Sequence, residues 1–392
     1  MPTVQLTPAQ IRWQRFKRSG LVQPFADAPT AASALIGVQA QILPAAALAL
    51  WNRIPEFSHS SFDELLYQER TLVKLWGQRG TLHLYASEDW PLLHAAWSIN
   101  RTWWERKATR DPEHGEAAVA KRHALVEQVA ELLRSQEAMG RRDLRASDLP
   151  LSDDLLSPWG GIFADLVRQG YACHYGRSEG EGRFVARERW LPDLAWEPPD
   201  AITANRTLVQ RYLAAYGPAT LQDFAYWRGV SAGNARPWFD DLASELVEME
   251  IDGDTAYFPK SAIDDALQPA PPAEAWPVRL LYRFDLYLLA HRDKDWVVPP
   301  EQYKAIFRPA GHIEGIILVR GQAAGTWRYD RKGSSLIITV NPFKQLPKYV
   351  LKQVERRAKQ VAAFFHLPLA DLVINPPAAP AGYRASAKKQ PQ

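Results

Sequence analysis

The apolar positions in the first 110 residues follow a helical period and then switch to the alternating period of strands. Thr7 and Pro8 are typical first residues of a helix, in which Ala9, Trp13 and Phe16 share one apolar stripe. Helices followed by a hairpin are typical of a winged-helix unit. The predicted helices are 7–18, 30–38, 44–53, 61–69 and 88–109, and the predicted strands are 72–76 and 79–85.

The same order of elements recurs twice further along the chain. In the last copy, Thr220 and Ser231 are the predicted N-caps of two helices and Gly229 is the turn between them, which is a helix-turn-helix signature. Repetition of one supersecondary unit supports each copy. The second unit has helices 117–133, 141–147 and 158–169 with strands 171–175 and 183–186, and the third has helices 203–216, 220–227 and 231–242 with strands 246–251 and 255–258.

A linker rich in Pro and Ala at 269–277 separates these units from a different C-terminal part. Its predicted strands are 280–289, 314–320, 325–329 and 336–340, and its predicted helix is 348–365. The predicted fold class is α+β, with three tandem winged-helix units followed by a C-terminal β-rich segment and a helix. The expected domains are 1–112, 113–200, 201–270 and 276–375, with a disordered tail at 376–392.

Composition narrows the class of protein. The 392 residues are 46% hydrophobic and 23% charged, which is typical of globular domains, and most of the fifteen Trp must serve packing. The single cysteine, Cys173, excludes an intramolecular disulfide and a thiolate-rich metal site. No signal-peptide pattern and no membrane-length apolar run is present. We therefore expect a soluble, cytoplasmic protein.

Charge is segregated along the chain although the formal net charge is only +3. Residues 1–110 carry +4, residues 111–271 carry −11 and residues 272–392 carry +10. This distribution is compatible with a protein whose basic ends bind nucleic acid and whose acidic middle does not contact it. Basic surfaces also occur for solubility alone.

The run Gly37–Pro44 places two uncharged amides, Gln39 and Gln41, where the apolar pattern predicts a core. A glutamine near a helix end is more often a solvated or capping residue. However, Pro44 disfavours a helical Leu43 and suits the first turn of a new helix. Gln39 and Gln41 are thus expected where one helix ends and another begins, and residues two apart in an extended segment face the same cleft.

The chain contains the motifs Gln39-Ala40-Gln41, Arg79-Gly-Thr-Leu-His83, Tyr216 to Gly229, Phe284 to Arg292 and Gly325-Thr-Trp327. These motifs resemble those of a known family, the winged-helix DNA glycosylases of the AlkZ and YcaQ type. The resemblance covers about residues 5–365, and Gln39-Ala40-Gln41 resembles the Gln-aliphatic-Gln motif of the AlkZ-like branch. It implies that the chain removes bulky alkylated purines and unhooks interstrand crosslinks, with Gln39 and Gln41 as catalytic residues.

Uncharged amides suit this chemistry when the substrate is cationic. An N7-alkylated guanine is already a good leaving group, so hydrolysis requires an oriented water and a polar environment more than an acid. A glutamine oxygen can accept a hydrogen bond from that water while its NH₂ donates elsewhere. Uncharged adducts are expected to be poor substrates.

Candidate DNA contacts lie on the first wing and in the basic C-terminal part. They are Arg79, Thr81, His83, Arg320 and Arg328. Two of these residues have an equally good interpretation without DNA contact. Arg79 could form an ion pair with an acidic residue, and His83 could be a core residue.

The chain shows no metal-binding motif, nucleophile elbow or phosphate-binding loop, so we expect no metal and no cofactor. Asp285, or Asp293 beside Arg292, is either half of a buried ion pair or part of an acid/base pair, and ion pairing is the commoner case.

Two functional hypotheses follow. The first is a monofunctional, metal-independent DNA glycosylase that acts on N7-alkylguanine in double-stranded DNA. The second is a non-catalytic winged-helix DNA-binding protein, such as a transcriptional regulator, because fold does not fix function. Regulators of this kind usually dimerise on palindromic sites, whereas three tandem units favour a monomer.

Overall fold

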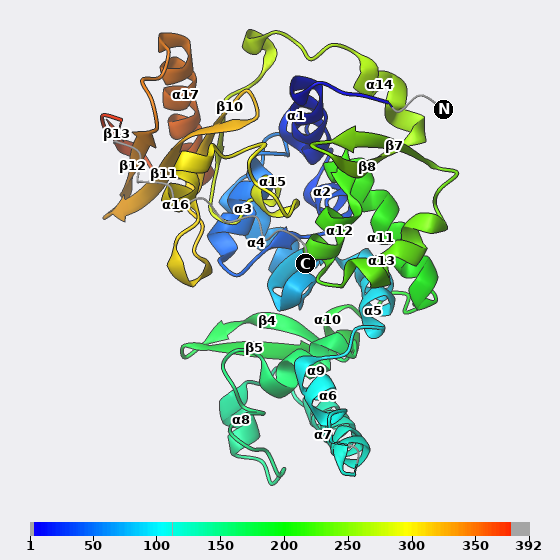
Figure 1. Cartoon of the computed structure of the whole chain (residues 1–392). Helices are drawn as coiled ribbons and strands as arrows, with labels where there is room; N and C mark the ends of the chain where they lie inside the picture. The colour runs from blue at the N-terminus through cyan, green and yellow to red at the C-terminus, as the bar shows by residue number, and fades with distance from the viewer. Residues whose placement is uncertain (1–3, 112, 378–392) are drawn as a thin grey trace.

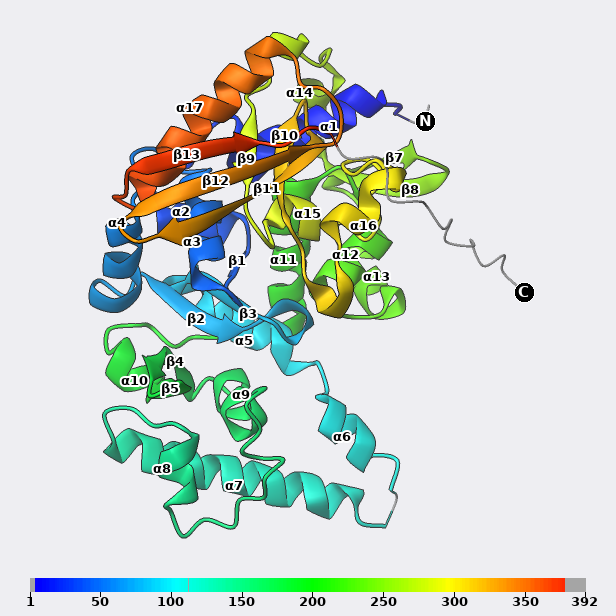
Figure 2. The same cartoon turned by 90° about the vertical axis from the view of Figure 1, so that its left-hand side faces the viewer.

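The computed structural model describes residues 4–111 and 113–377, which form helices packed around four β-sheets (Figure 1). Residues 103–190 make a separate lower lobe in both views, and the other units pack together above it (Figure 2). None of the helices in these residues is both long and apolar enough to cross a membrane. Residues 378–392, most of the predicted disordered tail, lie outside the described residues.

The first unit contains the three-stranded antiparallel sheet β1-β3-β2. Thr7 caps α1 through a capping box, because its hydroxyl accepts from the N–H of Gln10 (3.2 Å) and the Gln10 side chain accepts from the N–H of Thr7 (2.9 Å). Gly20, with φ +77°, interrupts the following π-helical turn Lys17–Leu21. The elements are α1 Pro8–Phe16, α2 Ala28–Ala34, β1 Val38–Gln39, α3 Leu43–Trp51, α4 His59–Asp63, β2 Leu72–Trp76, β3 Leu82–Ala86 and α5 Trp90–Ser98.

Two predicted helices of this unit are wrong. The helix predicted over 30–38 is α2, which ends at Ala34 because Ile36 (φ +54°) and Gly37 (φ +85°) adopt left-handed conformations. Val38 therefore begins a strand. The helix predicted over 88–109 is two helices, because α5 ends at Ser98 and Thr102 caps a new one.

The second unit forms the lower lobe and ends in the hairpin β4-β5 (Figure 1). The predicted elements are present with shifted ends. Trp76 of β2 stacks on Phe184 of β5 with ring centroids 5.7 Å apart, so this hairpin packs against the first wing. The elements are α6 Trp103–Ala108, α7 Gly115–Ser135, α8 Arg141–Arg145, α9 Gly161–Arg168, β4 Ala172–Ser178, β5 Glu181–Ala186 and α10 Arg187–Trp190.

The third unit is predicted most accurately. Thr220 caps α12 and forms a capping box with Asp223, Gly229 ends that helix in the left-handed conformation (φ +81°), and Ser231 caps α13. Its sheet has the order β6-β8-β7. The elements are α11 Ala201–Tyr216, β6 Ala219–Thr220, α12 Leu221–Arg228, α13 Ala232–Asp240, β7 Leu246–Ile251, β8 Asp254–Pro259 and α14 Ile263–Leu267.

The C-terminal part is a five-stranded sheet of order β13-β12-β11-β10-β9, with α17 along it (Figure 2). The strand predicted over 280–289 is wrong, because β9 ends at Leu281, Phe284 (φ +59°) turns the chain, and Asp285 caps the short helix α15. Strand β13, which pairs in parallel with β12, is not among the predicted strands. The elements are β9 Arg279–Leu281, α15 Leu286–Leu289, α16 Tyr303–Ile306, β10 Gly315–Val319, β11 Gln322–Lys332, β12 Ser335–Pro342, α17 Lys348–Phe364 and β13 Leu369–Ile374.

A buried ion pair joins the first unit to the C-terminal part. Both nitrogens at the end of the Arg53 guanidinium donate to Asp285, at 2.8 and 2.7 Å, and neither side chain is more than 1% exposed. Arg53 also donates to the carbonyl oxygens of Ser19 (2.7 Å) and Ala49 (2.8 Å). Asp285 therefore forms a buried structural ion pair, the commoner of the two interpretations. Asp293 forms a separate ion pair with Arg292 at 2.8 Å.

Candidate active site

The strand β1 places the two glutamines at the edge of the first sheet. Gln39 lies opposite His83 of β3, and the N–H of Ala40 donates to the carbonyl oxygen of Leu82 (2.7 Å). The chain then bends at Gln41 before α3 begins. The expectation that one helix ends and another begins here is correct. The extended segment in between is a strand that the first wing holds in place.

The three residues of the motif differ in burial. Gln39 is 7% exposed and Ala40 is fully buried in the main core, whereas Gln41 is exposed. Ala40 is small because its side chain enters the core behind the strand. Gln39 is thus an internal polar group, and Gln41 faces solvent.

Within the part of the chain that the structure describes, the side chain of Gln39 makes no hydrogen bond. Its Oε1 is buried and has no partner among the described residues. An unsatisfied buried acceptor destabilises a fold by ~1–3 kcal/mol, so such groups are rare unless water or a ligand satisfies them. The position is polar at the expense of stability, which is the pattern of a functional site.

His83 is a neutral neighbour of Gln39. It is 3% exposed, and its Nδ1 lies 3.0 Å from the carbonyl oxygen of Thr81. A carbonyl only accepts, so Nδ1 carries the hydrogen and Nε2 is left as an acceptor. Burial lowers the pKa of His83 to about 4, so the ring is uncharged at neutral pH. The structure thus places this predicted DNA contact inside the protein, next to Gln39.

A buried hydrogen-bond chain fixes the wing against the segment before β1. The hydroxyl of Tyr85 donates to Oε1 of Gln78, and Nε2 of Gln78 donates to the carbonyl oxygen of Ile36 (2.6 Å). Gly37 must be glycine here, because it has φ +85° and a Cβ would lie 2.2 Å from the Tyr85 ring. Sequence reasoning missed Gln78 and Tyr85, since only the fold brings them beside the glutamine motif.

The remaining predicted contacts lie in two places. Arg79 is in the wing turn Gln78–Gly80, and Thr81 is half-buried with its hydroxyl 3.1 Å from the carbonyl oxygen of Gln78. Arg320 and Arg328 are exposed on the five-stranded sheet, which shares no strand with the sheet of Gln39. The structure brings Gln39, Gln41, Arg79, Thr81 and His83 together in the first wing, and leaves the two C-terminal arginines apart from them.

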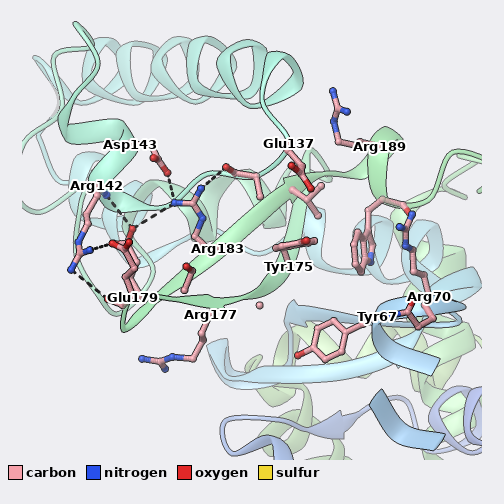
Figure 3. A pocket seen from close by; sticks show the side chains of 17 residues that line it. Tyr67, Arg70, Glu137, Arg142, Asp143, Tyr175, Arg177, Glu179, Arg183 and Arg189 are labelled. Carbon is pink, nitrogen blue, oxygen red and sulfur yellow. Dashed lines mark hydrogen bonds and ion pairs between the residues drawn. The ribbon is translucent and has the colours of Figure 1, made fainter. Parts of the chain in front are cut away.

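A separate cleft of about 1250 Å³ lies between the β4-β5 hairpin and residues 67–70 (Figure 3). Arg142 pairs with Glu179, and Arg183 pairs with Asp143 at 2.5 Å, so much of its charge is neutralised internally. Neither glutamine of the motif lines it. Across the described ranges, no group of three or more His, Cys, Asp or Glu side chains is placed to hold a metal ion.

The chain is a winged-helix protein, because units of helices followed by a hairpin recur along it. The first of these units carries the pair of uncharged amides. A family model described as DNA glycosylase AlkZ-like matches residues 32–364, so the chain belongs to the AlkZ-like DNA glycosylase family. The family predicted from the motifs is therefore confirmed.

Two comparisons with individual proteins agree with this family. The chain is 29% identical over 337 residues to the interstrand DNA cross-link repair glycosylase of Streptomyces sahachiroi, covering 84% of this chain and 88% of that protein. It also superimposes on the structure of Streptomyces sahachiroi DNA glycosylase AlkZ with a TM-score of 0.77 and 27% identity, covering 95% of this chain and all of the other.

Proposed function

We propose that the protein is a monofunctional DNA glycosylase that hydrolyses the N-glycosidic bond of cationic N7-alkylguanine in double-stranded DNA and unhooks interstrand crosslinks built on that lesion. The similarity to the interstrand DNA cross-link repair glycosylase of Streptomyces sahachiroi supports the crosslink activity. The observation that carries the proposal is the buried, partner-free Oε1 of Gln39.

The proposed reaction needs an oriented water more than a proton donor. The amide oxygen of Gln39 accepts a hydrogen bond from the water and aims its oxygen at C1′ of the damaged nucleotide. As the C1′–O bond forms, the C1′–N9 bond breaks and its electrons neutralise the positive charge of the purine. The water proton passes to solvent, and the products are an abasic site and the free alkylguanine.

The two amides then have different tasks. Gln39, buried beside the neutral ring of His83, holds the water. Gln41, exposed at the bend, meets the substrate from the solvent side. A neutral polar site also suits a sugar that gains positive charge in the transition state, because a fixed cation there would oppose it.

The test compares wild type with Gln39→Ala and Gln41→Ala. Release of N7-methylguanine from alkylated duplex, and unhooking of a nitrogen-mustard crosslink, are measured at single turnover. We expect wild type to act on both substrates and both variants to lose most of the activity. Equal activity in all three proteins removes the pair from the mechanism, and no activity on any cationic lesion favours a DNA-binding protein without catalysis.

A further inference from the structure

Two cations from distant parts of the chain lie against one tyrosine ring. The guanidinium carbon of Arg79 is 5.0 Å from the ring centroid of Tyr226, and Nζ of Lys294 is 5.3 Å from it. Arg79 belongs to the first wing, Tyr226 to α12 of the third unit, and Lys294 to the segment after α15. Tyr226 is 39% exposed, so this cluster opens onto the surface.

Lys294 lies in the cluster without a counter-ion. It is only 6% exposed, its Nζ donates to the carbonyl oxygen of His291, and no carboxylate of the described chain lies within 4 Å of it. The two carboxylates in its vicinity are occupied. Asp223 accepts from the N–H of Arg292 at 2.8 Å, and Asp293 pairs with the Arg292 guanidinium.

Arg79 is the second cation that lacks a counter-ion. Its Nε is buried without a hydrogen-bond partner among residues 4–111 and 113–377, and no carboxylate there forms an ion pair with it. The turn that carries Arg79 is packed against Gly229, where a Cβ would lie 3.2 Å from the backbone nitrogen of Arg79. Burial, and next the charge of Arg79, lower the pKa of Lys294 to about 7. Asp223 and Asp293 act on Lys294 in the opposite sense, but neither forms an ion pair with it. Two basic side chains therefore lie against one ring, and neither has an ion-pair partner within 4 Å among the described residues.

We propose that Arg79 and Lys294 form a binding site for one phosphodiester group of the DNA backbone near the damaged nucleotide. A phosphodiester carries one negative charge on two free oxygens, and it satisfies one Arg donor and one Lys donor at once. The Tyr226 ring holds both cations by cation–π contacts. The site deepens the proposed function and rests on it.

The position of the site fits a phosphate beside the glutamine pair. Arg79 is three residues before Leu82, whose carbonyl oxygen accepts the N–H of Ala40 between the two glutamines. In this proposal a DNA strand held by Arg79 and Lys294 lies on the same wing as the backbone bond that fixes the glutamine motif. Because the two cations come from different units, DNA bound here is held by the first wing and the C-terminal part together.

The test pairs a charge-removing variant with removal of single phosphate charges. A duplex with a tetrahydrofuran abasic analogue fixes the register and cannot be hydrolysed, and methylphosphonates replace the phosphates around it one at a time. We expect one position to weaken wild-type binding about tenfold and to weaken binding by Lys294→Met clearly less, because one of the two cations at that phosphate is then already missing. Salt dependence gives a second measure. Between 50 and 200 mM salt, the loss of affinity should be about 3.5-fold smaller for Lys294→Met than for wild type.

Control variants separate this site from general effects of charge. Lys260→Met removes an exposed lysine after β8 and should keep the wild-type methylphosphonate pattern. Lys294→Met removes a buried charge, so the melting temperature of this variant should not fall. An unchanged melting temperature would show that misfolding does not cause its altered methylphosphonate pattern. Arg79→Met should show a reduced effect at the same position as Lys294→Met.

Three results would overturn or separate the two proposals. Identical methylphosphonate patterns in wild type and Lys294→Met would show that the lysine holds no phosphate of DNA. Wild-type retention of inorganic phosphate, lost in Lys294→Met without any change in duplex binding, would assign the site to a free anion and overturn the DNA assignment. Coupling at one phosphate in a protein that releases no alkylguanine would support this site and refute the proposed glycosylase reaction.

Discussion

Replacing Gln39 with methionine should stabilise the protein while abolishing its activity. Methionine has a similar length and no polar atoms, so Gln39→Met removes a buried acceptor that has no partner. Removal of such a group should raise the free energy of unfolding by ~1–3 kcal/mol. For a chain of 392 residues the entropy of unfolding is ~0.8 kcal/mol/K, which makes the expected rise in melting temperature ~1–4 °C.

The same substitution should lower single-turnover release of N7-methylguanine by ~10²–10³-fold, the range found when a preorganised hydrogen-bonding group is removed from an active site. Gln41→Met is the matched control, because Gln41 is exposed and its loss should change stability by less than about 0.5 kcal/mol. The reasoning fails if Gln39→Met melts below wild type, which would mean that the amide is already satisfied in the folded protein. It also fails if the variant keeps full activity.

Three other substitutions have expected outcomes. Asp285→Ala leaves the buried Arg53 guanidinium unpaired and should lower the free energy of unfolding by ~3–5 kcal/mol in guanidinium titrations; a loss below about 1 kcal/mol would contradict this. The pKa of His83 is lowered from 6.5 to about 4, so the unfolded chain binds the extra proton between these values. Because of this proton uptake, the free energy of unfolding should fall by up to ~3 kcal/mol as pH falls from 6.5 to 4. In His83→Phe, the free energy of unfolding should change less over this pH range. Arg328→Ala removes a charge that is 60% exposed and should weaken duplex binding and reduce its salt slope by ~0.9, and an unchanged slope would exclude Arg328 from the phosphate contacts.

Local signals explain which elements could be predicted from sequence. The helices of the third unit can be predicted from the sequence, because the capping and turn preferences of Thr220, Gly229 and Ser231 coincide with the apolar period. The errors arose where backbone geometry overrides that period. Ile36 in a left-handed conformation ends a helix that its apolar neighbours continue, and the Phe284 turn converts an apolar run into a strand and a short helix.

The candidate site was only partly within reach of the sequence. Gln39 could be singled out because it is polar in an apolar run, but its missing hydrogen bonds and its pairing with His83 depend on β3, about 40 residues away. Lys294 gave no signal. It lies in the run His-Arg-Asp-Lys-Asp, which resembles a solvated loop, and only the packing of α12 against the first wing makes it a buried, unpaired charge.

The buried pair between Arg53 and Asp285 has a consequence for the synthesis of the chain. Arg53 leaves the ribosome 232 residues before the carboxylate that neutralises it. At ~5–20 residues per second, the arginine waits for roughly 10–50 s, a time in which its guanidinium must stay hydrated. Arg53, which follows α3, therefore gains its buried ion-pair partner only after the C-terminal part has emerged. The first unit, which carries β1 and the candidate residue Gln39, therefore gains this contact late in biosynthesis, although its residues are among the first to be made.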